Sequence, residues 1–291
     1  MEIKEEIKIF TNCRPDVKAA YGYGSGVFKQ KGYSKKDHPQ IDLILAVDDI
    51  RKFHKENMML NPNDYSFTGR VFYNTSSRET IKGMNGITYQ SNIKENGLTF
   101  KYGVIEANDL EHQLLTWNRF YLAGRFQKPV LEVVKSEQLK YAIEENRRYA
   151  LLTALQFMKD GDSLMDLYER IVSFSYIGDT RMRYFENPNK IKNIVLASYE
   201  ELDSIYNTGI YFDEIDGKII LNKEKIEKEL LPAYLAYYLT DKERKQGIEE
   251  YLKIRNKEES ISQTLHGLKT NGIVKSADYA FEKLKKRIYK K

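Results

Sequence analysis

The chain has 291 residues, of which 41% are hydrophobic and 31% are charged. That length can bury a sizeable core and favours a division into two domains. No apolar run approaches the roughly 18 residues of a membrane-spanning helix, which argues against a membrane-embedded enzyme. The formal net charge of +5 is too small to require a nucleic-acid partner.

Cysteine usage and the N-terminal segment indicate the compartment. The single cysteine, Cys13, cannot form an internal disulfide, which is typical of a reducing environment. Because no His or Cys clusters with it, we expect Cys13 to be a small buried residue. The segment MEIKEEIKIF has three glutamates and neither an Arg-rich nor an apolar leader. We therefore expect a bacterial, cytoplasmic chain, or one already trimmed.

Residues 1–23 are expected to form a short helix and an apolar strand that leads into a glycine-rich turn. After a polar loop, the apolar run Ile41–Val47 predicts a second strand. Asp49 then has the position and residue type of an N-cap for a helix over Ile50–Leu60, which Asn61-Pro62 would end.

The middle of the chain alternates between strand and helix signals. Three strands are predicted near Gly69–Tyr73, Gly86–Gln90 and Leu98–Ile105. Apolar residues then recur at helical spacing over 108–122, 136–159 and 163–174, with Gly124 expected to close the first helix. Later, Asp216-Gly217 lies within an apolar run and predicts a hairpin.

These elements predict an α+β fold in three parts. We expect a mixed sheet with helices over 1–130, a helical winged-helix-like domain over 131–235, and a C-terminal helical region over 236–291. A winged helix often binds DNA, but no basic recognition helix is visible here. A scaffold role is therefore favoured, and no nucleic-acid partner is expected.

The turn formed by Gly24, Ser25 and Gly26 predicts a phosphate-binding site. Glycine lets the backbone approach a ligand closely, so the turn can offer its N–H groups and the Ser25 hydroxyl to a phosphate. No Gly-Lys-Ser/Thr follows as in a Walker loop, and a strand rather than a helix comes next, which excludes a dinucleotide fingerprint. A plain tight turn is the alternative.

Acids at the ends of the strand Ile41–Val47 suggest a metal ligand. Strand alternation places Asp42 and Asp48 on one face, but about six residues at ~3.3 Å each separate them, too far for one ion. Asp42, near the turn, is the predicted ligand of the magnesium that a phosphate would bring. A phosphate-binding turn beside a metal-binding acid is the layout of a nucleotidyltransferase, which is the fold that we expect for the mixed sheet over 1–130. Asp48 and Asp49 are expected to end the strand and cap the next helix.

Several motifs follow one another along the chain. They are YGSGVF at 23–28, IDLILAVDD at 41–49, NDYS at 63–66, KYGVI at 101–105, WNRFYLAGRFQKPV at 117–130, SYIGDTRM at 175–182 and SISQTLHGLKTNG at 260–272. In this order they resemble the mitochondrial-type CDP-diacylglycerol synthase family, also called the mitochondrial translocator assembly and maintenance family. The resemblance covers nearly the whole chain and is weakest over about 200–255. It implies transfer of CMP from CTP to phosphatidic acid, which releases pyrophosphate and gives CDP-diacylglycerol.

The second metal acid must come from outside the strand, because Ile44 stands where nucleotidyltransferases usually carry another carboxylate. Asp179, in the loop Gly178-Asp179-Thr180-Arg181, is the predicted second Mg²⁺ ligand, and an intraloop Asp–Arg pair is the alternative. We expect Asp42 and Asp179 to be catalytic. The resemblance implies a catalytic role for Lys101 as well, and a lysine on a solvated face of the strand is the alternative. Lys101 and Arg181 are also expected to contact the nucleotide, together with Gly24, Ser25 and Gly26.

Arg125 and Lys128 are candidates for binding the phosphatidate headgroup or pyrophosphate, because arginine binds phosphate bidentately and lysine acts as a point charge. His38, His54, His112 and His266 lack metal spacing and are expected to be structural or solvated.

The C-terminal tail, 276–291, has the pattern of an amphipathic basic helix. A short apolar stripe is accompanied by six cations near the chain end. Such a helix is typical of a segment that lies in a lipid interface, and a helix packed on the protein is the alternative. We therefore expect a peripheral protein on the inner face of the cell membrane. The resemblance implies that its partners are CTP and phosphatidic acid in an anionic bilayer. For eukaryotic relatives, the resemblance implies the matrix side of the inner mitochondrial membrane.

Two other classes of function stay open on the sequence. One is a soluble nucleotidyltransferase that acts on a small molecule or an RNA end. The other is a non-catalytic nucleotide-binding scaffold at a membrane. The absence of a second carboxylate on the strand suggests this alternative.

Overall fold

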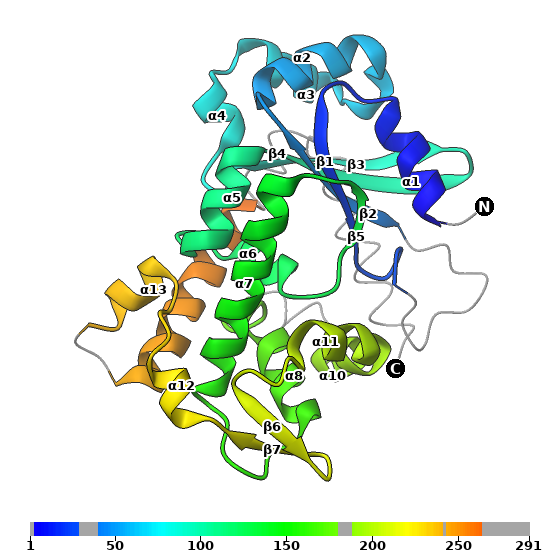
Figure 1. The fold of residues 1–291 in the computed structure, drawn as a ribbon. Helices are drawn as coiled ribbons and strands as arrows, with labels where there is room; N and C mark the ends of the chain where they lie inside the picture. The colour runs from blue at the N-terminus through cyan, green and yellow to red at the C-terminus, as the bar shows by residue number, and fades with distance from the viewer. Residues whose placement is uncertain (1–2, 29–39, 180–187, 241–242, 264–291) are drawn as a thin grey trace.

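A computed structural model describes residues 3–28, 40–179, 188–240 and 243–263. Its centre is a five-stranded mixed sheet in the order β3-β4-β2-β1-β5 (Figure 1). The strands are β1 Val17–Tyr23, β2 Ile41–Val47, β3 Ile87–Glu95, β4 Leu98–Glu106 and β5 Leu131–Val134. Only β2 and β4 pair in parallel, and the other neighbours are antiparallel. The α+β class with a mixed sheet is confirmed.

Each face of the sheet is covered by helices that bury alternate side chains of the strands. Ile41, Leu43 and Leu45 point to one face. That face packs against α1 Ile3–Asn12, α2 Ile50–Leu60, α3 Phe67–Thr75 and α4 Arg78–Lys82, with the 3-10 turn η1 Pro62–Asp64 between α2 and α3. Ile44 and Ala46 point to the other face, against α5 Ala107–Thr116, α6 Tyr121–Phe126 and α7 Glu137–Leu155.

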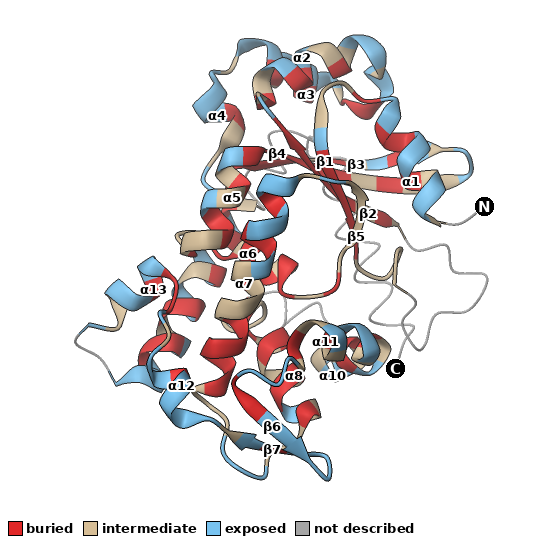
Figure 2. Ribbon diagram, viewed as in Figure 1, coloured by how far each residue is buried: buried red, intermediate tan, exposed pale blue. Residues whose placement is uncertain are grey.

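A second core lies beyond the sheet. Helix α7 reaches both cores, since Leu139 and Ile143 pack on the sheet while Ala150 and Leu155 pack in the second core (Figures 1 and 2). The other elements around this core are α8 Leu164–Ser173, α10 Lys190–Ala197, α11 Tyr199–Tyr206, β6 Phe212–Ile215, β7 Lys218–Leu221, α12 Lys223–Glu227, α13 Ala233–Tyr238 and a helix over 244–263. Within the ranges described, no helix is both long and apolar enough to cross a membrane.

Local signals in the sequence located several elements to the residue. Strand β2 and helix α2 have the predicted bounds, and the Asp49 side chain accepts a hydrogen bond from the Lys52 amide at 2.8 Å. The helices predicted over 136–159 and 163–174 are α7 and α8, whose N-caps are Ser136 and Ser163, and α7 ends at Leu155. The predicted hairpin is β6–β7, and its turn residues Asp216 and Gly217 both have positive φ.

Other expectations were wrong. The strand predicted at Gly69–Tyr73 is part of helix α3, whose start is capped by Ser66. Tyr73 stacks on His54 from that helix, with ring centroids 3.9 Å apart, so packing decides its conformation over β propensity. Cys13 is exposed, not buried. The helix predicted over 108–122 ends at Thr116, and Gly124 lies inside α6.

The domain division and the winged-helix-like arrangement stay predictions. The sheet takes its strand β5 from 131–134, just past the boundary expected at 130.

Candidate active site

Three side chains of the predicted site region lie side by side across the sheet. Asp42 on β2 is the register partner of Tyr23 on β1 and of Lys101 on β4. All three point to the face covered by α5, α6 and α7, because they alternate with residues of the opposite core. The fold thus brings an acid and a cation from separate strands to one place, next to the glycine-rich turn.

The glycine-rich turn packs directly against the start of β2. Gly24 has a φ of 74°, and a Cβ atom there would lie 3.5 Å from Asp42 Oδ2. A Cβ atom on Gly26 would come within 2.3 Å of the Gln40 carbonyl oxygen, so only glycine fits. The amides of Val27 and Phe28 donate to the Gly24 carbonyl at 3.1 and 2.9 Å. Among described residues, no such bond engages the amides of Ser25 or Gly26, which belong to the turn beside Asp42.

Lys101 is positioned by a tyrosine from the neighbouring strand. Its Nζ lies 4.6 Å from the centroid of the Tyr89 ring, a cation–π geometry. Tyr89 is paired with Gly103, where a Cβ atom would be 2.6 Å from the ring. The glycine of the KYGVI motif therefore makes room for the ring on which Lys101 rests.

Arg125 on α6 lies in a tyrosine cluster that continues from Lys101. Its guanidinium carbon is 4.2 Å from the Tyr23 ring centroid and 5.4 Å from that of Tyr121. Arg125 donates to the Tyr121 hydroxyl at 3.4 Å, and Tyr89 donates to the same oxygen at 3.1 Å. Burial next to Asp42 raises the pKa of Tyr23, so this phenol is neutral at pH 7. The rings hold Arg125 without neutralising its charge.

Lys128 continues the cationic surface towards the second core. Its Nζ donates to the Gly124 carbonyl and to Ser175 Oγ, both at 2.5 Å. The Tyr176 ring lies between Lys128 and Lys190, at 5.4 and 5.2 Å from the two Nζ atoms. Burial, together with the charges of Arg125 and Lys190, lowers the pKa of Lys128 well below its usual value. A bound anion would relieve this repulsion.

Asp179, the predicted second metal ligand, is 7% exposed and lies in the segment that follows α8. Ser260 Oγ donates to Asp179 Oδ1 at 3.4 Å, and the Asp179 amide donates to the Tyr176 carbonyl. In the part of the chain that the structure describes, no group of three or more His, Cys, Asp or Glu side chains is arranged to hold a metal. A metal shared by Asp42 and Asp179 thus stays a prediction. Arg181 and the tail 276–291 lie outside the described residues.

Asp48 and Asp49 have the structural roles expected of them. Asp48 is exposed and pairs with Lys18 at 3.0 Å, and Asp49 caps α2. His54 is also structural: it is fully buried, with its ring nitrogens bonded to the hydroxyls of Tyr65 and Thr88. His112 is exposed. His38 and His266 lie outside the described residues.

Part of the motif pattern serves a buried polar network on the opposite face of the sheet. Arg14 pairs with Asp64 at 3.2 Å, and Tyr102 donates to the same carboxylate at 2.6 Å. Asn57 donates to the hydroxyls of Tyr65 and Tyr102. Because every member is buried and bonded within the network, we assign these residues to the fold rather than to ligand binding.

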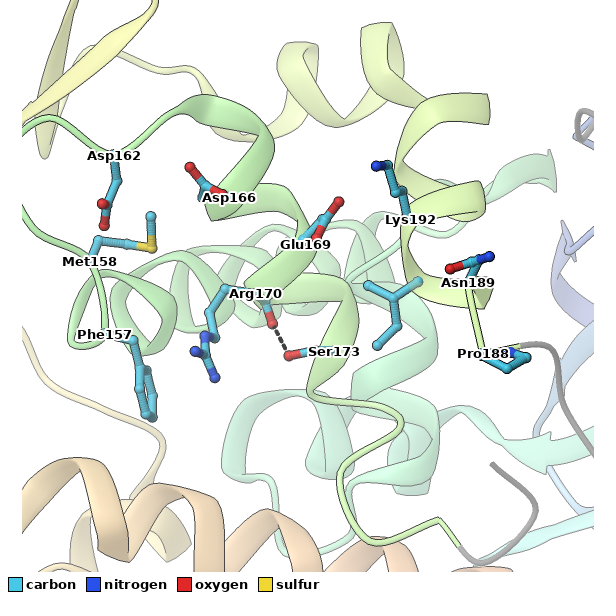
Figure 3. A pocket seen from close by; sticks show the side chains of 11 residues that line it. Phe157, Met158, Asp162, Asp166, Glu169, Arg170, Ser173, Pro188, Asn189 and Lys192 are labelled. Atoms are coloured by element: carbon cyan, nitrogen blue, oxygen red, sulfur yellow. Dashed lines mark hydrogen bonds between the residues drawn. The ribbon is translucent and has the colours of Figure 1, made fainter. Parts of the chain in front are cut away.

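A large open cavity lies between α8 and α10. Figure 3 shows side chains of α8 and the chain before it facing Asn189 and Lys192 across a space of about 690 Å³. None of the predicted site residues lines it. Its Asp166 is occupied in the capping box of α8, which favours a structural role.

Sequence reasoning missed the residues that organise the cations. They are Tyr23, Tyr89, Gly103, Tyr121, Ser175, Tyr176 and Lys190. Most of them fall inside the quoted motifs, so their place in these motifs could have marked them as candidate site residues. Tyr89 and Lys190 do not, and only the fold brings them to the site.

Comparison with known proteins identifies the family. A profile of the family described as "Phosphatidate cytidylyltransferase, mitochondrial" matches residues 7–230. The chain belongs to this family. Among its curated mitochondrial phosphatidate cytidylyltransferases, the Schizosaccharomyces pombe protein is 35% identical over 272 residues, 93% of this chain and 66% of that protein. The Saccharomyces cerevisiae protein is 32% identical over 292 residues, 97% of this chain and 70% of its own.

The chain thus spans about two thirds of the length of these mitochondrial phosphatidate cytidylyltransferases. The resemblance expected from the motifs is confirmed. Among solved structures, a nucleotidyltransferase-like protein from Exiguobacterium sibiricum aligns with 92% of this chain and 75% of its own at 12% identity. The TM-score of 0.26 is too low to support an argument from that likeness.

Proposed function

We propose that this chain is a phosphatidate cytidylyltransferase, which converts CTP and phosphatidic acid into CDP-diacylglycerol and pyrophosphate. The observation that carries the proposal is the placement of Asp42 and Lys101 beside the Gly24 turn, facing Arg125. Arg125 and Lys128 have only neutral hydrogen-bond partners among the described residues, so both can bind phosphate groups. Both substrates are phosphate anions, as this surface requires.

The amides of the turn and the ammonium of Lys101 suit the triphosphate of CTP, because oriented N–H groups and a fixed cation bind phosphate oxygens. Arg125 and Lys128 suit the phosphate of phosphatidic acid or the departing pyrophosphate. Membership of the family supports this pair of substrates.

Mg²⁺ is the proposed cofactor. Magnesium in nucleotide sites is usually held by one or two carboxylates together with substrate phosphates, so a single carboxylate at Asp42 beside the turn fits. We propose Asp42 as its ligand and Asp179 as the second. When bound, the ion would neutralise charge on the triphosphate.

The chemistry needs positioning more than proton transfer. An oxygen of the phosphatidate phosphate, already anionic, attacks the α-phosphorus of CTP while the bond to the pyrophosphate oxygen breaks in line. Negative charge grows on the pyrophosphate, and the cations Lys101, Arg125 and Lys128 are suited to stabilise it.

We further propose that the chain acts peripherally at an anionic bilayer on the inner face of the cell membrane and that the tail 276–291 contributes contacts there. Relatives carry the word mitochondrial in their names. Pelleting with phosphatidate vesicles at rising salt, with and without the tail, tests the membrane contact. Binding that neither salt nor truncation changes would contradict it.

The decisive assay incubates the purified chain with CTP labelled at the α-phosphate, Mg²⁺ and phosphatidate vesicles. We expect labelled lipid and stoichiometric pyrophosphate, and no lipid product when the vesicles lack phosphatidate. Transfer of label to a soluble acceptor instead would favour a different nucleotidyltransferase. Bound CTP without turnover would favour the scaffold.

A further inference from the structure

The helix over 244–263 contacts both segments that carry the cations of the site. Glu259 is buried, and its Oε1 accepts a hydrogen bond from the Phe120 amide at 2.6 Å. Asn256 is also buried, and its Nδ2 donates to the carbonyls of Phe174 and Ile177 at 2.7 and 2.8 Å. These polar side chains lie one helical turn apart and reach two separate parts of the chain.

The Phe120 amide lies at the N-terminal end of α6, the helix that carries Arg125. Phe120 is the N-cap residue of α6 and has no side-chain group that could cap it. The first amides of a helix have no partner within it, so an acceptor oxygen from elsewhere in the chain stabilises the start of the helix. Glu259 supplies this group from 139 positions along the chain, and so fixes where α6 begins.

The carbonyls of Phe174 and Ile177 bracket the loop that contacts Lys128. Between them, Ser175 Oγ donates to the Gly124 carbonyl at 2.7 Å and accepts from Lys128 Nζ. The same loop contributes the Tyr176 ring beside Lys128. Helix α6 and this loop therefore meet at the site, while Asn256 and Glu259 hold both from the side of the C-terminal helix.

The C-terminal helix is itself fixed to the body of the protein. Asn85 Nδ2 donates to the Glu259 carbonyl at 3.1 Å, and the Tyr251 hydroxyl donates to the Trp117 carbonyl. Lys253 packs so closely on Gly178 that a Cβ atom there would be 2.7 Å from the Lys253 carbonyl oxygen. The helix is thus a rigid support and not a loosely attached extension.

We infer that Asn256 and Glu259 are positioning residues, which hold Arg125 and Lys128 at the spacing that the substrate phosphates require. The identity of those substrates rests on the proposed function. The positioning itself rests on the hydrogen bonds above, so it can be tested without turnover.

The test compares Glu259→Ala, Glu259→Gln and Asn256→Ala with Glu258→Ala, a control on the exposed side of the same helix. Amide hydrogen exchange and steady-state kinetics with CTP and phosphatidate vesicles are measured for each. In Glu259→Ala we expect exchange at Phe120 and along 121–126 to rise at least 10-fold, with no change in β2. We expect kcat/KM to fall at least 10-fold in Glu259→Ala and Asn256→Ala. Glu259→Gln keeps an acceptor oxygen and should stay within about 3-fold of wild type, as should Glu258→Ala.

Unchanged exchange along 120–126 in Glu259→Ala would overturn the inference, and so would exchange that rises equally in β2, because that reports general destabilisation. If Glu259→Ala does not fold, Asn256→Ala with unchanged kcat/KM is the overturning result. A wild-type protein with no turnover would count against the proposed function alone, because the exchange comparison still decides the positioning.

Discussion

Asp42 and Lys101 are register partners on β2 and β4, the only parallel pair among the described strands of the sheet. Neighbouring strands lie about 4.8 Å apart, so the carboxylate and the ammonium emerge next to each other on one face. The glycine turn borders this place on the side of β1, where a Cβ atom on Gly24 would lie 3.5 Å from Asp42 Oδ2. One row of the sheet thus presents both the proposed metal ligand, Asp42, and the proposed phosphate-binding cation, Lys101.

Asp42→Asn should reduce turnover at least 100-fold while the protein still folds. The amide keeps the shape of the side chain, so no cavity forms, but it removes the charge that a divalent ion needs. Product formation and thermal melting should be measured on the same sample. Asp48→Asn is the matched control, because Asp48 lies just past the other end of the strand, where it is exposed and pairs with Lys18. Near-normal activity in Asp42→Asn would exclude Asp42 as a metal ligand.

Asp179→Ala should lose nearly as much activity, since β2 carries Ile44 where a second carboxylate is usual. The rates of the variant and of wild type should be compared across a magnesium titration. A metal ligand predicts a rightward shift of the magnesium dependence. If the rate is normal even at low magnesium, Asp179 is structural, held by Ser260 as the fold shows.

Gly103→Ala should lower both stability and activity. The new Cβ would lie 2.6 Å from the Tyr89 ring, which must then move away from Lys101. Overpacking of this kind typically costs about 1–3 kcal/mol of unfolding free energy. The double variant with Tyr89→Ala should recover part of the stability but not the activity, because the ring is the support of Lys101. If the losses of unfolding free energy in Gly103→Ala and Tyr89→Ala simply add in the double variant, the two residues are not coupled and this prediction is wrong.

Binding of CTP or phosphatidate should take up a proton at Lys128. Burial and the neighbouring cations lower its pKa, so the ammonium loses its proton as pH rises, whereas a bound phosphate favours the charged form. Affinity should therefore decline as pH rises through the lowered pKa. Calorimetry in buffers of different ionisation enthalpy measures the uptake directly. Lys128→Met should abolish it and Lys192→Met, an exposed control, should not.

Glu259 should make the protein less stable as pH rises. Burial raises its pKa from 4.5 to about 7. The backbone amides of Phe120 and Tyr121 and the charges of Arg255 and Arg119 lower the pKa, but their effect is smaller than that of burial. Between pH 4.5 and 7 the folded state keeps a proton that the unfolded state has released, so unfolding free energy falls across this range and levels off above it. Urea unfolding of wild type and Glu259→Gln should show a difference that grows in favour of the glutamine variant towards pH 7. Parallel pH profiles would contradict the shift.

Local features of the sequence determined the fold class, the bounds of β2 and α2, the β6–β7 hairpin and the turn at Gly24. These depend on alternation, capping residues and glycine, whose effects act within a few residues. The same features placed Asp42 beside the turn. The same features gave a wrong prediction at 69–73, where the sequence GRVFY has strand composition but lies in helix α3, and Tyr73 stacks on His54 inside the core.

Only the tertiary structure decided which side chains surround the cations. Tyr89 reaches Lys101 because Gly103 leaves space on the neighbouring strand, and Glu259 reaches Phe120 across 139 positions. Such contacts depend on how helices and strands pack, and no local pattern of residues encodes a partner that far along the chain.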